Sequence, residues 1–386
     1  MMEEWKEYKL SEVATLTTGF PFDGHKYGKE GIRVVRGDNV TIGSLRWDTE
    51  KDKRWNEPFE RASEFSLSAE DIVIGMDGSR VGRNRAKVKQ EDLPLYIAQR
   101  VACIRHNELS LQSFLYYQIF SQTFENYIKA VQTGTSIPHV SLKQIGDFPI
   151  LLPSLKVQQR ISSILKSLDD KIEVNRRINE NLEQQAQALF KSWFVDFEPF
   201  RDGEFVESEL GMIPKGWRVY SLSEFLPVIT GKKDANVAKG GQYPFFSCSQ
   251  DYGWTDNYSF DGNAILVAGN GDFNVKMYNG KFEAYQRTYV LMPYNPKYTA
   301  WLYYAVKFHL NEITSAARGS VIKFITKGNL ADFKFPAPSI LEDEGIIEKF
   351  DRIKKKTASN EEEIRCLASI RDTLLPRLMS GEIKID

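Results

Sequence analysis

The sequence predicts an α+β fold: two strand-rich domains joined by two long helices that pair as an antiparallel coiled coil, arranged as a pseudo-two-fold internal repeat. Three observations lead to this prediction. Blocks of sequence recur along the chain, each copy contains short apolar runs between turn residues, and each copy ends in a long heptad-patterned segment. A chain of 386 residues is also long enough for two or three domains.

The composition narrows the class of protein. Hydrophobic residues make up 42% of the chain and charged residues 27%, which is typical of soluble globular proteins. There is no run of about 18 apolar residues, so the sequence predicts no membrane span. Cys103, Cys248 and Cys366 stand apart, without the spacing of a zinc site or a disulfide framework, which indicates a reducing, cytoplasmic compartment. Because the net charge is −1, any contact with nucleic acid requires a local basic patch.

Two blocks of sequence occur twice, in the same order. The block that starts at Trp5 recurs 212 residues later at Trp217, and Asp147-Phe148 recurs 185 residues later at Asp332-Phe333. The offset falls by 27 residues, so the second copy is shorter within its strand-rich part. The repeated residues are Trp5, Tyr8, Leu10, Ser11, Glu12, Thr18 and Gly19 in the first block, and Gly134, Asp147, Phe148, Pro153 and Ser154 in the second.

Short apolar runs between glycine- and asparagine-rich turns predict the strands of each copy. The first copy contains Ile72–Ile74 and Val101–Ile104, and the second contains Ala264–Ala268 and Thr288–Met292. After a Pro-Ser step, each copy then changes to a helical pattern.

The helical segments carry an a/d heptad pattern over about 33 residues, or roughly 50 Å of helix. A stripe of this length exceeds what a small domain can cover, so we expect the two helices to pair. The alternative is that each helix only covers its own domain. The expected seam consists of Ile161, Leu165, Leu168, Ile172, Asn175, Leu182 and Leu189 in the first helix, and Ile346, Phe350, Ile353, Asn360, Ile364, Leu367 and Leu374 in the second.

An asparagine lies in the middle of each seam. If the helices pair antiparallel and symmetrically, Asn175 and Asn360 meet near the pseudo-two-fold axis. A buried asparagine pair lowers stability but specifies register. The alternative interpretation is that both are solvated interruptions of the apolar stripe.

These patterns divide the chain into four segments. The first strand-rich domain covers residues 1–152 and the first helical segment 153–198. The second strand-rich domain covers 199–337, with a leading linker at 199–216, and the second helix with its tail covers 338–386.

The helical blocks resemble those of the specificity (S) subunits of type I restriction–modification enzymes. The helix that starts near Pro153 is similar to the central conserved region of that family, and the end of the chain is similar to its C-terminal conserved region. Segments of the strand-rich parts resemble target recognition domains. The residues that carry the resemblance are Pro153–Leu155, Gln158-Gln159, Leu168–Ile172, Leu189–Phe197 and Ile370–Gly381 in the helices, and Gly31–Val40, Asp71–Ser79, Tyr243–Gly253 and Gln286-Arg287 in the strand-rich parts.

The resemblance implies a DNA-recognition subunit without a catalytic centre. Two target recognition domains would read the two half-sites of a bipartite, asymmetric DNA target separated by a non-specific spacer. Two methyltransferase (M) subunits would dock on the conserved helices, and motor/nuclease (R) subunits would join for cleavage. S-adenosylmethionine, ATP and magnesium would then belong to partner subunits. The second seam departs from the first by carrying Thr357 and Arg371, which leaves the symmetry of methyltransferase docking open.

Catalytic motifs are missing from the sequence. It contains neither the Asn/Asp-Pro-Pro-Tyr/Phe motif that holds a flipped adenine nor the Gly-x4-Gly-Lys-Ser/Thr loop that binds nucleotide phosphates. None of the four histidines lies in a recognisable motif, and no metal site is expected. Two other hypotheses remain: a helical scaffold that does not read bases, and a DNA methyltransferase or nuclease with unrecognised motifs.

A glycine-rich basic segment and two Gln-Arg steps are the candidates for DNA contact. Arginine can bind phosphate or the O6 and N7 atoms of guanine, glutamine suits adenine, and glycine lets a backbone approach closely. The alternative is a solvated loop or strand end. The candidates are Gly78, Ser79, Arg80, Arg83, Arg85, Lys87, Gln99 and Arg100 in the first copy, and Asn270, Asn274, Lys276, Gln286 and Arg287 in the second.

A further pair of matching segments has two interpretations. Residues 133–136 and 317–320 could hold phosphates through hydroxyl and amide groups. We favour the other interpretation, in which each is the turn that leads toward the final strand of its copy.

Overall fold

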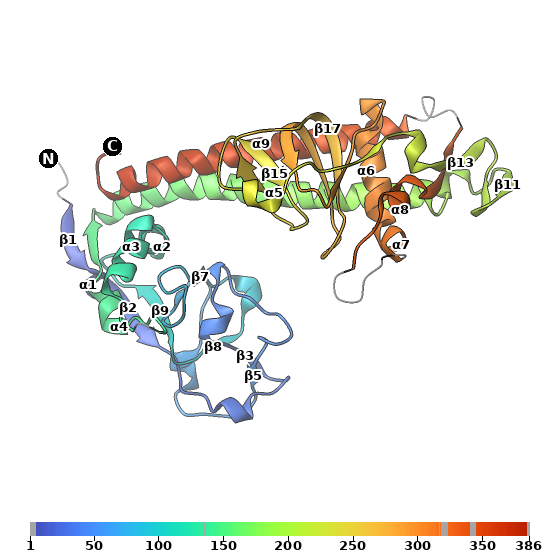
Figure 1. Ribbon diagram of the computed structural model, residues 1–386. Coiled ribbons are helices and arrows are strands. Elements are labelled where there is room, and N and C mark those ends of the chain that lie inside the picture. The colour runs from blue at the N-terminus through green and yellow to red at the C-terminus, as the bar shows by residue number, and fades with distance from the viewer. Residues whose placement is uncertain (1–4, 135, 316, 318–322, 340–344, 384–386) are drawn as a thin grey trace. The chain divides into compact units, whose positions relative to one another are not determined.

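The computed structural model describes residues 5–134, 136–315, 317, 323–339 and 345–383 (Figure 1). The chain forms two compact units, Met1–Ile172 with Arg365–Asp386, and Glu173–Ile364. Each unit therefore contains one strand-rich domain together with part of each long helix. This division cuts across both long helices, which begin at Leu155 and Ile346, whereas the expected borders at 153 and 338 divide the chain by sequence order.

The first unit contains a five-stranded sheet, a three-stranded sheet and a separate two-stranded pair. Its strands are β1 (Lys6–Lys9), β2 (Ala14–Thr18), β3 (Ile32–Val35), β4 (Ile42–Gly43), β5 (Arg54–Trp55), β6 (Ile72–Gly75), β7 (Arg85–Lys87), β8 (Leu95–Ile97), β9 (Val101–His106) and β10 (Pro149–Leu152), and its short helices are α1 (Leu10–Val13), α2 (Gln112–Ile119), α3 (Gln122–Val131) and α4 (Leu142–Gly146). The sheet orders are β2-β9-β6-β7-β4 and β5-β3-β8, and β1 pairs with β10.

Alternation along β6 explains how the five-stranded sheet is buried on both faces. Ile72 and Ile74 belong to the core that the helices cover, whereas Val73 belongs to a second core with residues of β3 and β8. Successive side chains of a strand point to opposite faces, so a run without polar residues indicates a strand covered on both sides. All three side chains have no exposed surface.

The second unit contains a six-stranded sheet and two separate strand pairs. Its strands are β11 (Phe205–Ser208), β12 (Gly211–Pro214), β13 (Trp217–Ser221), β14 (Val228–Thr230), β15 (Tyr243–Phe246), β16 (Gly253–Thr255), β17 (Phe260–Ala268), β18 (Val275–Ala284), β19 (Thr288–Leu291) and β20 (Lys334–Pro338), and its short helices are α6 (Thr299–Phe308), α7 (Leu310–Ser315) and α8 (Lys327–Ala331). The large sheet has the order β14-β19-β17-β18-β15-β16, and the pairs are β11-β12 and β13-β20. All four apolar runs that predicted strands lie in β6, β9, β17 and β19, except that β19 ends one residue early, at Leu291.

The internal repeat is confirmed by strand register. Lys6 pairs with Leu152, and the repeat-related residues Arg218 and Ala337 pair in the same way. The next strand pairs match as well. Leu16 of β2 pairs with Ile104 of β9, and the equivalent residues Val228 of β14 and Leu291 of β19 pair in the same way. The two sequence blocks therefore recur because each copy closes its domain with the same strand pairs.

The glycine of the repeated Thr-Gly step is required because another part of the backbone passes very close to it. A Cβ atom at Gly19 would lie 2.2 Å from the carbonyl oxygen of Ile97, and one at Gly231 would lie 2.1 Å from that of Tyr285. Neither distance is compatible with a side chain. Glycine lets the chain leave β2 or β14 in contact with the turn that precedes β9 or β19.

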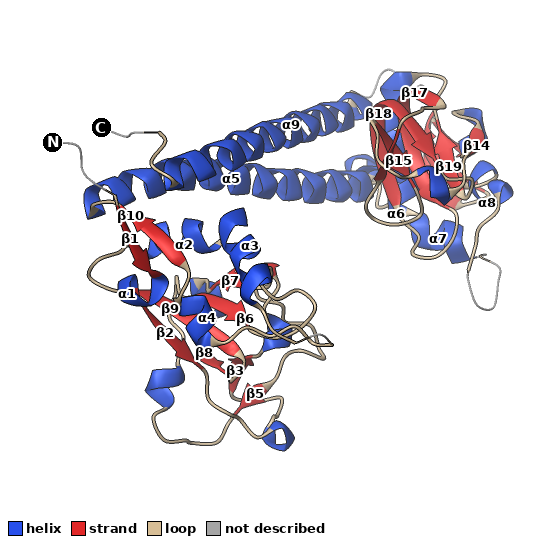
Figure 2. Cartoon of the chain, turned by 60° about the vertical axis from the view of Figure 1, so that its left-hand side comes forward, coloured by secondary structure: helices blue, strands red, loops and turns tan. Residues whose placement is uncertain are grey.

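The long helices α5 (Leu155–Phe194) and α9 (Ile346–Met379) run antiparallel within each unit (Figures 1 and 2). In the first unit, Arg371 forms an ion pair of 2.8 Å with Asp169, and in the second, Lys354 lies 3.3 Å from Glu183. All residues of the expected seam are buried or partly buried. Arg371, which departs from the apolar pattern of the seam, therefore joins the two helices through a carboxylate.

The ends of the helices also cover their own domains. Ile161 and Leu165 share a core with α2, α3 and α4, and Phe350 shares a core with α6. The two interpretations of the apolar stripe are therefore both partly correct. At the helix ends the same stripe serves both roles, because the core around Ile161 also contains Leu378 of α9, and the core around Phe350 also contains Phe190 of α5.

The central asparagines are buried, so their interpretation as solvated interruptions is wrong. Asn175 and Asn360 are each 1% exposed. The amide of Asn360 donates to Asn179 at 2.7 Å, and that of Asn175 donates to Glu363 at 2.8 Å. The described hydrogen bonds thus place Asn360 opposite Asn179, about one turn from the expected position opposite Asn175. The ion pairs Arg371–Asp169 and Lys354–Glu183 fit the same register.

We expect Asn360→Leu to lower the free energy of unfolding by about 1–3 kcal/mol, because the side-chain oxygen of Asn179 loses its donor. The double variant Asn179→Leu/Asn360→Leu should recover most of this loss. Urea unfolding followed by circular dichroism measures both. Ser359→Ala, an exposed change on the same helix, is the matched control. A double variant less stable than Asn360→Leu alone would contradict the pairing.

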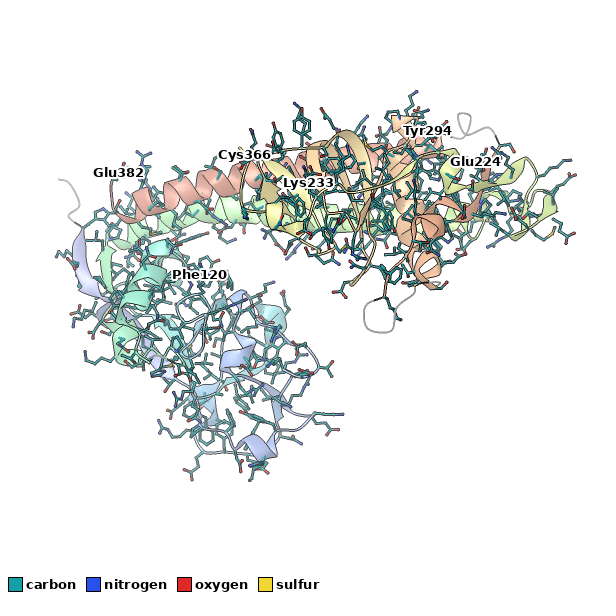
Figure 3. The ribbon with its side chains drawn as sticks, in the orientation of Figure 1. Phe120, Glu224, Lys233, Tyr294, Cys366 and Glu382 are labelled. Atoms are coloured by element: carbon teal, nitrogen blue, oxygen red, sulfur yellow. The ribbon has the colours of Figure 1, made fainter. Side chains whose placement is uncertain are left out.

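No described helix has a stretch apolar and long enough to cross a membrane. The three cysteines are unpaired, and Cys366 is exposed on α9 (Figure 3).

Candidate DNA interface

The first Gln-Arg step lies in the first unit, where the turn before β9 contacts the residues after β6, which in turn contact the segment at Val140. The carbonyl oxygen of Arg100 accepts from the backbone N–H of Met76 at 3.0 Å, and that of Met76 accepts from Val140 at 2.9 Å. Arg100 has a φ of 70°, the left-handed region, which turns the chain sharply just before β9. This turn leaves the side chains of Gln99 and Arg100 exposed.

The second unit repeats this arrangement around its own Gln-Arg step. The backbone N–H of Gly269 donates to the carbonyl oxygen of Arg287 at 2.8 Å, and that of Ile325 donates to Gly269 at 3.0 Å. A Cβ atom at Gly269 would lie 2.4 Å from the carbonyl oxygen of Arg287, so the crossing requires glycine here. Gln286 and Arg287 are again exposed. The step therefore occupies equivalent positions in both copies.

A cavity of about 590 Å³ adjoins the first Gln-Arg step. It contains five of the residues that the sequence singled out for DNA contact in the first copy. Those residues are Gly78, Ser79, Arg80, Gln99 and Arg100. Other lining residues come from the segment between β2 and β5 and from residues next to β6, β7 and β8. They include Phe22, Tyr27, Arg36, Asp38, Arg46, Asp77 and Asn84.

Arginines outnumber acidic residues in the lining of this cavity. Four arginines line it, against the carboxylates of Asp38 and Asp77. Asp77 lies 3.3 Å from Arg100 and also hydrogen-bonds His139, and Asp38 lies 3.1 Å from Lys51. The excess of fixed positive charge favours an anionic ligand.

Arg85, expected as a DNA contact, is instead a buried structural residue. It is 6% exposed, and its guanidinium donates to the carbonyl oxygens of Ile119 and Ser121 at 2.6 and 3.2 Å. The guanidinium also lies 5.5 Å from the ring centroid of Phe120. Burial lowers the pKa of Arg85, and the nearby carboxylate of Glu125 opposes this effect. Arg85 holds the junction of α2 and α3 to β7.

Two other basic residues of this segment also lie outside the lining of the cavity. Arg83 donates to Glu125 at 2.7 Å, and Lys87 lies 3.1 Å from Glu70. Alternation along β7 and the turn before it directs these side chains toward α2 and α3. The basic segment therefore divides into a part that lines the cavity, at 78–80, and a part that supports the domain.

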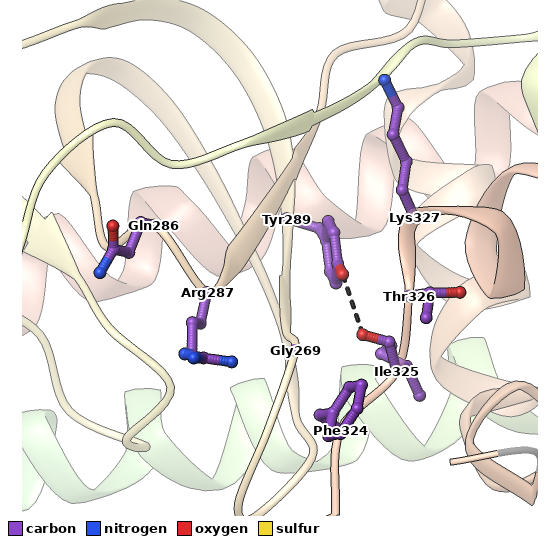
Figure 4. A pocket seen from close by; sticks show the side chains of 8 residues that line it. All are labelled: Gly269, Gln286, Arg287, Tyr289, Phe324, Ile325, Thr326 and Lys327. Atoms are coloured by element: carbon purple, nitrogen blue, oxygen red, sulfur yellow. Dashed lines mark hydrogen bonds between the residues drawn. The ribbon is translucent and has the colours of Figure 1, made fainter. Parts of the chain in front are cut away.

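A second cavity, of about 450 Å³, adjoins the other Gln-Arg step (Figure 4). Its wall opposite Arg287 is formed by residues 324–327, which lead into α8. The hydroxyl of Tyr289 donates to the carbonyl oxygen of Ile325 at 2.9 Å and ties the two walls together. The lining residues are Gly269, Gln286, Arg287, Tyr289, Phe324, Ile325, Thr326 and Lys327.

The remaining candidates of the second copy shape the neighbouring loop and do not line this cavity. Asn274 is 7% exposed and donates to the carbonyl oxygens of Cys248 and Asp272, both at 2.8 Å. Lys276 donates to a backbone carbonyl at 2.6 Å, and burial lowers its pKa. Asn270 forms a backbone bridge to the segment at 324.

The described residues on either side of residue 135 support the turn interpretation of the segment at 133–136. Thr133 and His139 exchange two backbone hydrogen bonds of 2.8 Å, and Gly134 has a φ of 89° between them. Residue 135 lies outside the described residues, as do 318–320 of the matching segment.

Sequence reasoning missed several lining residues, above all Arg36 and Tyr27. Arg36 lies in the segment 31–40, which resembled a family signature but contains no cluster of basic residues. In the second unit the missed residues Thr326 and Lys327 come from the start of α8, about 40 residues after the Gln-Arg step. Such residues meet only when the strands are assembled, so no local pattern marks them.

Comparison with known proteins agrees with this architecture. The family model described as "Type I restriction modification DNA specificity domain" matches residues 2–184 and 214–367. The structure is also similar to a crystal structure of the type I restriction-modification system S subunit from M. genitalium, with a TM-score of 0.59 and 16% identity over 100% of this chain and 98% of that one.

Three curated relatives span different shares of the chain. The EcoDI specificity subunit from Escherichia coli is 39% identical over 178 residues, which cover 45% of this chain and 40% of that relative. The MjaIX specificity subunit from Methanocaldococcus jannaschii is 28% identical over 310 residues, 72% of this chain and 70% of the relative. The HindI specificity subunit from Haemophilus influenzae is 25% identical and covers 99% of this chain and 100% of the relative. The chain belongs to the family of type I restriction–modification DNA specificity subunits.

Proposed function

We propose that the chain reads a bipartite, asymmetric DNA target, with each unit binding one half-site and a non-specific spacer between them. The observation that carries the proposal is the occurrence of an exposed Gln-Arg step, beside a cavity, at equivalent positions of both units. Paired recognition domains suit paired half-sites.

The difference between the two cavities supports an asymmetric target. The first has additional arginines at positions 36, 46 and 80, whereas the second is walled by Phe324, Thr326 and Lys327. Arginine pairs best with guanine and glutamine with adenine, but the neighbouring side chains decide which base edge each can reach. Two different sets of neighbours therefore favour two different half-site sequences.

The chain's partners follow from its family. We propose that two methyltransferase (M) subunits dock on α5 and α9 and that motor/nuclease (R) subunits complete the enzyme. Catalysis, together with S-adenosylmethionine, ATP and magnesium, would belong to those subunits. The chain itself would contribute sequence recognition.

Methylome mapping tests the proposal directly. Cells without other DNA methyltransferases would express this chain with its methyltransferase subunit, and methylated positions would be read by single-molecule sequencing. We expect one split motif with two different half-sites and a fixed gap. A contiguous motif would contradict the two-unit model. If the chain expressed without the M subunit leaves the DNA unmethylated, the chain has no methyltransferase activity of its own.

Alanine at either Gln-Arg step should relax only one half-site. We expect Arg100→Ala and Arg287→Ala each to reduce discrimination at one base pair by about 1–3 kcal/mol, because each removes a guanidinium that can pair with a base edge. The two variants serve as controls for each other, since each leaves the opposite half-site unchanged. Motif mapping of each variant provides the measurement, and relaxation of the same half-site by both would refute the assignment.

A further inference from the structure

Arg36 lines the first cavity, and hydrogen bonds of Asn39 fix its backbone. It follows β3 and precedes a 3-10 turn at Gly37–Asn39. The side chain of Asn39, which has no exposed surface, accepts from the backbone N–H of Arg36 at 3.0 Å. The same side chain donates to the carbonyl oxygens of Arg46 and Lys51 at 3.0 and 2.9 Å. Asn39 therefore ties the backbone at Arg36 to the backbone at Arg46 and Lys51.

The side chain of Arg36 is partly exposed and forms no hydrogen bond or ion pair with another of the described residues. Its Nε atom is buried without a hydrogen-bond partner, and its Cζ atom lies 5.7 Å from the ring centroid of Tyr27. A buried N–H group without an acceptor destabilises the free protein. The aromatic ring limits the directions in which the guanidinium can point and so prepares it for a ligand.

Most arginines of the strand-rich part of this unit have an acidic partner. Arg33 and Arg54 both pair with Asp52, and Arg105 pairs with Asp71. Within the described residues of this cavity, Arg46 and Arg100 also lie near carboxylates, whereas Arg36 and Arg80 form no described ion pair. The two arginines without an acid therefore line the same cavity.

We infer that Arg36 and Arg80 form a binding site for a phosphate of the DNA backbone beside the half-site of the first unit. This inference rests on the proposed function. A guanidinium can donate two N–H groups to paired acceptors, which either a phosphate or the O6 and N7 atoms of guanine supply. The excess of positive charge in the cavity favours the phosphate, which carries a full negative charge, over the neutral base.

Salt-dependent DNA binding by the full chain tests the site. The wild type, Arg36→Gln and Arg80→Gln would be titrated, alone and with the methyltransferase subunits, against a duplex with the mapped target and one of random sequence. We expect each variant to bind both duplexes about tenfold more weakly, with a slope of log affinity against log salt that is less steep by about one. Arg61→Gln, which removes an exposed arginine outside the cavity, should behave as the wild type.

The alternatives give different results. Unchanged binding by Arg36→Gln would overturn the inference, and so would loss of discrimination at one base pair with an unchanged salt slope, which indicates a guanine contact. If Arg36→Gln does not fold, the wild type would be tested instead against duplexes in which single phosphates are replaced by neutral methylphosphonates. The inference predicts that one replacement beside the first half-site weakens binding. If no such replacement weakens binding, the inference is wrong. A wild type that does not distinguish target from random duplex would contradict the proposed function, whatever the variants show.

Discussion

Replacing Glu125 with alanine is expected to lower the free energy of unfolding of the first unit by about 3–5 kcal/mol. Its side chain, 8% exposed, lies 2.7 Å from Arg83, 2.6 Å from Lys129 and 3.6 Å from Arg85. Arg85 is itself only 8% exposed on its side chain. Without the carboxylate, Arg85 stays buried beside another cation and has no counter-charge. Urea unfolding of the full chain, followed by circular dichroism, measures the loss.

Arg83→Ala is the matched control, because it removes a partner of the same carboxylate that is 54% exposed. Partly exposed ion pairs contribute little, so we expect a loss of about 1 kcal/mol or less. Equal losses for Glu125→Ala and Arg83→Ala would show that burial of Arg85 does not matter. That result would reopen the assignment of Arg85 as a structural residue.

The contribution of Glu125 should also depend on pH. Burial raises the pKa of this carboxyl, but hydrogen bonds from Lys129 and Arg83 outweigh it and leave the pKa at about 2, below the ordinary value of 4.5. A carboxyl whose folded pKa is depressed stabilises the fold above its unfolded pKa and loses this effect as pH falls through the folded one. The difference between the wild type and Glu125→Ala should therefore be constant above about pH 5 and shrink between pH 4.5 and 2.

Phe350→Ala is expected to destabilise the second unit by about 3–5 kcal/mol. Phe350 has no exposed surface, and its ring centroid lies 5.4 Å from that of Tyr304 and 6.2 Å from that of Phe190. The residue thus joins α9 to α5 and α6 at once. Truncation leaves a cavity among three helices that can relax only partly.

Ile370→Ala provides the comparison on the same helix. Ile370 is 43% exposed, so we expect its loss to change the free energy of unfolding by less than about 0.5 kcal/mol. Chemical denaturation of both variants measures the difference. If Phe350→Ala were as mild as Ile370→Ala, the N-terminal part of α9 would not belong to the core of the second unit.

Periodic patterns were the most informative part of the sequence. The heptad stripe predicted α5 and α9 because helical periodicity is local and every third or fourth residue faces the same side. The matched blocks predicted two copies of one domain, and the register of β1 with β10 and of β13 with β20 confirms this. The predicted pairing of Asn175 with Asn360 is wrong by about one turn, since Asn360 hydrogen-bonds Asn179 and Asn175 hydrogen-bonds Glu363. A heptad pattern predicts which face of a helix is buried, but a shift of one turn preserves that face, so the pattern does not fix the register.

The site residues were harder to predict than the fold. Gly78, Ser79, Arg80, Gln99 and Arg100 were singled out and do line one cavity, whereas Arg85 is buried and Arg36 was overlooked. Both arginines look alike in sequence, each beside short apolar runs and glycines. The two arginines differ in the partner that each contacts. Arg85 lies near the carboxylate of Glu125, 40 residues away in the chain, whereas Arg36 lies over the ring of Tyr27.

The sequence by itself determined the repeat, the two long helices and the family, because these depend on periodicity and on residues that recur at fixed spacing. The tertiary structure alone decided which cations face a cavity and which neutralise a buried carboxylate. The physical reason is that the environment of a charge depends on segments far apart in the chain. The packing of two sheets against one core brings the residues that follow β3, those that follow β6 and those that precede β9 together around one cavity. No local sequence pattern records that meeting.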